Sequence, residues 1–137
     1  MTNIFTPEKT AELSAQIDRQ LQELKTPPYS PTKLPETPPG FPVKQSQAIE
    51  EVTKEKPERF LHKFGRAAKS DLCEEGGLLN SQWKKWGDLN NQDVVDKFGV
   101  LLVMMGFSGA ALEILVVAIA VTVIHIGIKA FCEDYSQ

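Results

Sequence analysis

The sequence predicts an all-α protein in which a single-pass membrane helix follows short amphipathic helices and a proline-rich extended linker. Residues 98–128 form an apolar run of 31 residues in which only Glu113 and His125 are ionisable, and about 20 apolar residues are enough for a helix to cross a bilayer. Earlier stretches repeat apolar residues at helical spacing. Seven prolines between residues 27 and 42 exclude regular structure there.

The first segment, residues 1–25, has the pattern of an amphipathic helix. Thr6 is a favourable N-cap and Pro7 suits the first helical position. Apolar residues then recur at spacings of three and four, at Leu13, Ile17, Leu21 and Leu24. This single narrow stripe predicts a helix that either docks on the rest of the protein or binds a cytosolic protein partner.

Residues 26–45 are predicted to be an extended linker, because prolines this dense favour polyproline II. At about 3.1 Å per residue the linker would hold the first helix about 50 Å from the next helical segment. Its P-x-x-P segments lack the basic residue that a strong ligand of a proline-binding domain would carry. A spacer is therefore favoured over a recognition motif.

Residues 46–97 are predicted to form a basic amphipathic region beside the membrane. Pro57 suits a helix start, and Gly76 and Gly77 favour its end. One face is apolar, with Phe60, Leu61, Phe64, Ala67, Ala68 and Leu72. The other is basic, with Arg59, Lys63, Arg66 and Lys69. Such a face either covers a small core or lies on an anionic leaflet; binding to nucleic acid is disfavoured, because no aromatic or glycine-rich motif accompanies the charges.

Two tryptophans and two lysines precede the apolar run. Trp83 and Trp86 flank Lys84 and Lys85, a pattern typical of side chains at headgroup level, although core tryptophans are the alternative. The predicted membrane-surface anchor comprises Arg59, Lys63, Arg66, Lys69, Trp83, Lys84, Lys85 and Trp86. Asn90 or Asn91 then caps a helix that is expected to continue into the run.

Residues 98–131 are predicted to be one transmembrane helix, followed by a short tail at 132–137. Small residues and one glutamate repeat every seven positions, at Gly99, Gly106, Glu113, Ala120 and Gly127, and Gly109 and Ala110 widen this stripe. Small residues let membrane helices approach closely. The stripe therefore predicts an interface with a membrane partner or a second copy. Two alternatives remain: a hairpin broken at 106–109, and a soluble protein whose buried hairpin has the same composition.

Three further expectations follow if residues 98–131 span the membrane as one helix. Glu113 would cost about 2.5–3.5 kcal/mol near the bilayer centre, so it is expected to be protonated or paired. Lys84, Lys85 and Lys97 outnumber Lys129 across the run, which places the N-terminal region in the cytosol. Cys73 and Cys132 would lie on opposite faces of the membrane, and they are therefore expected to be free thiols.

The functional expectation is non-enzymatic. A net charge of -3 excludes a globally basic nucleic-acid binder, and neither a catalytic nor a cofactor or metal motif is recognisable. The leading hypothesis is a membrane-anchored adaptor or accessory subunit, which presents the first helix to a partner and packs in the membrane through the stripe. The alternative is an oligomeric pore with Glu113 at the helix interface.

Overall fold

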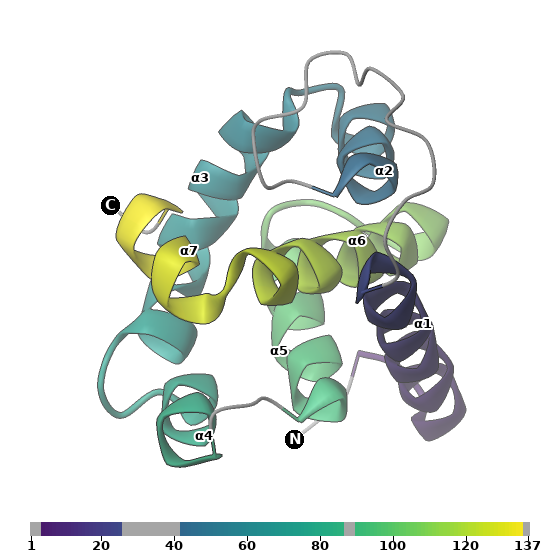
Figure 1. The fold of residues 1–137 in the computed structure, drawn as a ribbon. Coiled ribbons are helices and arrows are strands. Elements are labelled where there is room, and N and C mark those ends of the chain that lie inside the picture. The colour runs from purple at the N-terminus through teal and green to yellow at the C-terminus, as the bar shows by residue number, and fades with distance from the viewer. Residues whose placement is uncertain (1–3, 26–41, 87–89, 136–137) are drawn as a thin grey trace.

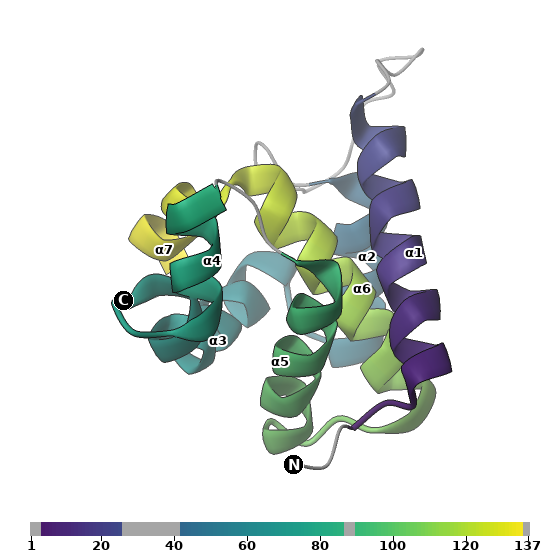
Figure 2. The ribbon, with the colours of Figure 1, turned by 90° about the horizontal axis from the view of Figure 1, so that it is seen from below.

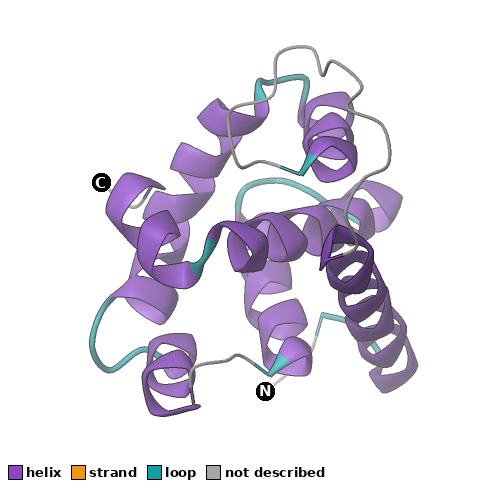
Figure 3. Ribbon diagram, viewed as in Figure 1, coloured by secondary structure: helices purple, strands orange, loops and turns teal. Residues whose placement is uncertain are grey.

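The computed structural model describes residues 4–25, 42–86 and 90–135, and every regular element in these ranges is helical (Figures 1 and 3). The elements in chain order are α1 (Pro7–Lys25), α2 (Val43–Thr53), α3 (Pro57–Ala68), the π-helical turn η1 (Lys69–Cys73), α4 (Leu78–Trp86), α5 (Asn91–Met104), α6 (Gly109–Ile126) and α7 (Ile128–Tyr135). The all-α prediction is confirmed for these ranges. Most of the predicted linker lies outside them, and α2 begins within its last residues.

The starts of three helices agree with the sequence signals. The backbone N–H of Lys9 donates to the Thr6 hydroxyl oxygen (3.1 Å), so Thr6 caps α1. Pro57 occupies the first turn of α3. The Asn90 side-chain oxygen accepts from the N–H groups of Gln92 and Asp93, at 2.9 and 3.2 Å, and so caps α5.

α6 lies at the centre of the bundle. Figure 2 shows it running between the other helices, with α1, α2 and α5 packed against it. Residues 115–123 are buried without interruption. A helix that is apolar on all sides suits a position enclosed by other helices. α1 contributes Leu13 and Ile17 to this core, so in this fold it is docked on the bundle.

The prediction of one continuous helix over residues 98–131 is wrong, because the chain turns back between α5 and α6. The N–H of Phe107 donates to the Leu102 carbonyl (3.1 Å) and that of Gly106 to the Val103 carbonyl (3.0 Å). This is the Schellman pattern of a helix end, and it needs a left-handed residue, which Gly106 supplies with a φ of 106°. The backbone is therefore a helical hairpin, which both alternatives to a single span contain.

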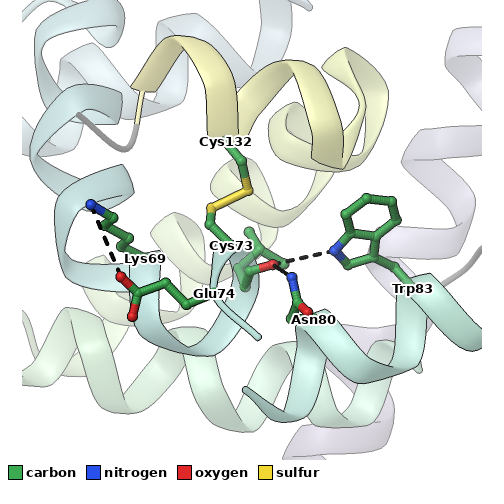
Figure 4. The surroundings of a disulfide bond; sticks show 7 residues. Lys69, Cys73, Glu74, Asn80, Trp83 and Cys132 are labelled. Atoms are coloured by element: carbon green, nitrogen blue, oxygen red, sulfur yellow. Dashed lines mark hydrogen bonds and ion pairs between the residues drawn. A yellow bond between two sulfur atoms is a disulfide. The ribbon is translucent and has the colours of Figure 1, made fainter. Parts of the chain in front are cut away.

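The expectation of two free thiols is also wrong, since Cys73 and Cys132 form a disulfide (Figure 4). It joins η1 to α7. The expectation assumed a membrane between the two cysteines, whereas the turn at 105–108 brings both flanks of the apolar run to the same bundle. Close packing of α7 on α3 accompanies the disulfide: a Cβ at Gly65 would collide with the backbone carbonyl of Tyr135.

Candidate membrane-associating surface

The turn between α5 and α6 forms an exposed apolar end of the bundle. The exposed apolar side chains of α5 that lead into this turn are Val100, Val103 and Met104, and we call them the hairpin tip. Ile114 is also exposed, but it lines a separate hollow with Lys44 and Gln45 of α2. Met104 is 77% exposed. Neither acid nor base occurs between Phe98 and Leu112. An exposed group of apolar side chains on a small protein marks a surface for lipid or protein.

α6 follows the turn in the chain. Among the helices in the described ranges, it is the one that is long and apolar enough to cross a membrane. It has 18 residues and a mean hydropathy of 2.3, and 56% of it is buried in the bundle. A core helix of a soluble protein has the same length and composition. α6 is thus weak evidence for a location in the membrane.

Glu113 has a partner within the chain. Its carboxylate lies 3.2 Å from the Lys9 ammonium group, and both side chains are about one-third exposed, 37% for Glu113 and 33% for Lys9. The hydrogen bond that this carboxylate accepts raises the pKa of Lys9. The cost expected for a carboxylate at a bilayer centre does not arise in this fold, because Glu113 is at the surface and faces a cation.

The seven-residue stripe is divided among several elements. Gly106 lies in the turn, Gly109 is the first residue of α6, and Gly127 separates α6 from α7. Gly99 lies against the Phe5 ring, and Ala120 is buried in the core. The remaining members, Ala110 and Glu113, lie on the first turns of α6. These residues therefore do not form a straight stripe, and their contact with another membrane helix stays a prediction.

The basic side of α3 is exposed, as the sequence predicts. We define the basic face as Lys56, Arg59, Lys63 and Arg66, which line an open hollow of about 430 Å³ together with Glu58 and His62. Lys63 pairs with Glu55 at 2.7 Å. Arg59 and Arg66 form no ion pair within the described part of the chain. The two guanidinium groups are therefore available to an anionic partner.

The other members of the predicted anchor are dispersed. Lys69 lies 4.0 Å from Glu74, and Lys84 and Lys85 are exposed on α4. The Trp83 indole is half-buried and donates its N–H to the Leu72 carbonyl (3.2 Å), as Figure 4 shows. Its polar edge has a partner inside the protein, which fits the core alternative. The side chain of Trp86 is outside the described residues.

The features together define a helical bundle built around one apolar helix, with an uncharged hairpin turn and a basic helix at its surface. Within the described ranges, the acidic, histidine and cysteine side chains form no group of three that could hold a metal ion. Neither a protein-family model nor a curated protein nor a solved structure matches the chain. The surface chemistry is therefore the basis for assigning a function.

Proposed function

We propose that this protein is a non-enzymatic membrane-associated adaptor or accessory subunit, and that the α5–α6 hairpin enters the bilayer from one face. The observation that carries this proposal is α6, an apolar helix of 18 residues, whose turn to α5 exposes the hairpin tip. Bilayer insertion would give those exposed side chains an apolar surrounding, which is worth roughly 25 cal/mol per Å² of surface removed from water.

Helix lengths favour entry from one face over a complete crossing. At about 1.5 Å per residue, the 14 residues of α5 extend about 21 Å, which is less than a hydrocarbon core of about 30 Å. A single pass with α6 alone as the span would put Cys73 and Cys132 on opposite faces and would require their disulfide to be broken. A hairpin that enters and leaves on one face keeps the disulfide.

The side of the membrane on which the bundle lies stays a prediction. The lysine distribution favours the cytosol for the N-terminal region, whereas a stable disulfide is typical of an oxidising compartment. In the adaptor role, a partner of α1 would bind its exposed face, because Leu13 and Ile17 are buried in the core. The pore alternative has no supporting observation of its own, since Glu113 already pairs with Lys9.

Carbonate washing and vesicle flotation of the full chain test this proposal. We expect the protein in the washed membrane pellet, and we expect purified protein to float with vesicles. Val103→Ser with Met104→Ser should weaken flotation, because both side chains belong to the exposed tip. Leu78→Ser is the matched control, since Leu78 is 44% exposed on α4. Recovery of all the protein as a soluble monomer, or equal losses in tip and control variants, would contradict the proposal.

A further inference from the structure

We infer that the basic face of α3 and the hairpin tip dock together on an anionic lipid bilayer. This inference rests on the proposed function and adds the lipid class and the residues that select it. It combines two surfaces from segments far apart in the sequence, residues 56–66 and 100–104.

An aromatic contact at the edge of the core packs the turn that follows the hairpin tip against α3. The Phe107 ring, in the turn between α5 and α6, meets the Phe60 ring of α3 edge to face, with centroids 5.7 Å apart. Residues three or four positions apart lie side by side on a helix. Lys63 is three residues after Phe60, Arg59 immediately precedes Phe60, and Lys56 is the extended residue before the first turn of α3. The point at which the turn meets α3 is therefore flanked by cations.

The charge of the basic face complements anionic headgroups. Glu58 is the one acid lining the hollow, against two lysines and two arginines. Arg59 and Arg66 are exposed, and the planar fork of a guanidinium group matches the oxygens of phosphate and carboxylate. Both groups are present in an anionic phospholipid such as phosphatidylserine.

The neighbouring tip distinguishes a bilayer from other anionic partners. Nucleic acid would satisfy the arginines and lysines but would leave Val103 and Met104 in water. A bilayer presents anionic headgroups in one plane and hydrocarbon directly beneath them, so a hairpin tip can enter while cations beside it stay at headgroup level. Phe98 to Leu112 contains no charge that would oppose entry.

Vesicle partitioning with charge variants tests the inference. The variant Arg59→Gln with Arg66→Gln removes two charges from the basic face. Its control, Lys44→Gln with Lys84→Gln, removes two charges from α2 and α4. Lys44 pairs with Glu23 near the end of α1, and Lys84 is exposed on α4, so neither belongs to the basic face. Binding to vesicles with and without phosphatidylserine is measured at low and high salt.

We expect the arginine variant to bind phosphatidylserine vesicles roughly 30-fold more weakly than the unmodified chain, since each basic residue near an anionic leaflet contributes about fivefold. The difference should shrink at high salt, because screening shortens the range of the attraction. The control should lose much less. The unmodified chain should bind pure phosphatidylcholine vesicles more weakly than phosphatidylserine vesicles. On pure phosphatidylcholine, the arginine variant and its control should bind equally well.

Two results overturn the inference and are distinguishable from failure of the proposed function. Equal binding to neutral and anionic vesicles, lost only in the tip variant, would remove the lipid selectivity and leave the membrane role intact. Equal losses in the arginine variant and its control would show that net charge, not the basic face, drives binding. Failure to bind any vesicle would overturn both proposals, and tighter binding to RNA than to vesicles would assign the basic face to a nucleic acid.

Discussion

Breaking the disulfide between Cys73 and Cys132 should lower the free energy of unfolding more than any single change at the surface. The bond joins η1 to α7 across a sequence separation of 59 residues. Without it, the unfolded chain regains the conformations that this large loop excludes. The folded state should keep its helices, because Phe131 of α7 remains fully buried in the core.

The size of the effect depends on the loop. A closed loop of this separation, 59 residues, corresponds to about 4 kcal/mol in the chain-entropy description. Small domains have unfolding free energies of about 5–15 kcal/mol, so the loss is a large part of the total. With a urea dependence of about 2 kcal/mol per molar, the unfolding midpoint should fall by about 2 M.

Urea unfolding of three samples measures this change: the unmodified chain, the same chain with a thiol reductant, and Cys73→Ser with Cys132→Ser. Tryptophan fluorescence is a suitable signal, because the Trp83 indole donates to the Leu72 carbonyl next to Cys73. The reduced chain and the double variant should unfold together. Reductant should not affect the double variant, which serves as the control for unspecific effects.

Two outcomes would refute the reasoning. One is a midpoint that is the same in all three samples, which would mean that closing this loop does not restrict the unfolded chain enough to stabilise the fold. The other is the detection of two free thiols in unreduced, denatured protein, which would show that the two cysteines do not pair. A fall in the midpoint with a changed urea slope would instead indicate that α7 has left the folded state.

Three further predictions address the core, a helix cap and a partly buried carboxylate. Leu115→Ala should lower the free energy of unfolding by about 2–5 kcal/mol, because the side chain is fully buried. Met104→Ala is the control at an exposed position, and it should change the free energy of unfolding by about 0.5 kcal/mol or less. Equal losses of the two variants in urea unfolding would contradict the central position of α6. Asn90→Ala should cost about 1 kcal/mol, since Asn90 caps α5, and amide exchange in the first turn should become faster; unchanged exchange would exclude a capping role. Burial, aided by the charge of Asp93, raises the pKa of Asp96 above 3.8. The folded state therefore binds this proton more tightly than the unfolded state, so the contribution of Asp96 to stability is present at low pH and is lost as the pH rises through its folded pKa. Asp96→Asn should flatten this part of the stability curve, and an unaltered pH dependence in urea unfolding would exclude Asp96 as its source.

Local signals predicted the helix starts well. Thr6 and Pro7 at α1, Pro57 at α3 and Asn90 at α5 act through hydrogen bonds and backbone angles of their own neighbourhood. Such features depend on few residues and need no knowledge of the tertiary fold. The exposed basic side of α3 was predictable for a similar reason, since charged side chains opposite an apolar stripe have to face outward.

The path of the apolar run could not be decided by composition. A helix that is enclosed by other helices and one that is enclosed by lipid both need apolar residues on every side, as in 115–123. The two cases differ in whether other segments supply enough apolar surface to cover the helix, and this depends on tertiary packing. The turn signal at Gly106 was visible, but the length required of a membrane span favoured a continuous helix. The missed disulfide resulted from that choice.

The central position of α6 also affects how the protein is made. α1 and α2 leave the ribosome well before α6, which is their main packing partner, because α3, η1, α4 and α5 are all synthesised first. Until α6 has been synthesised, the apolar faces of α1 and α2 lack this partner, and exposed apolar surface favours aggregation. The core therefore cannot close until residue 126 has been added, and a nascent chain that stalls before residue 109 would be a natural substrate for chaperones.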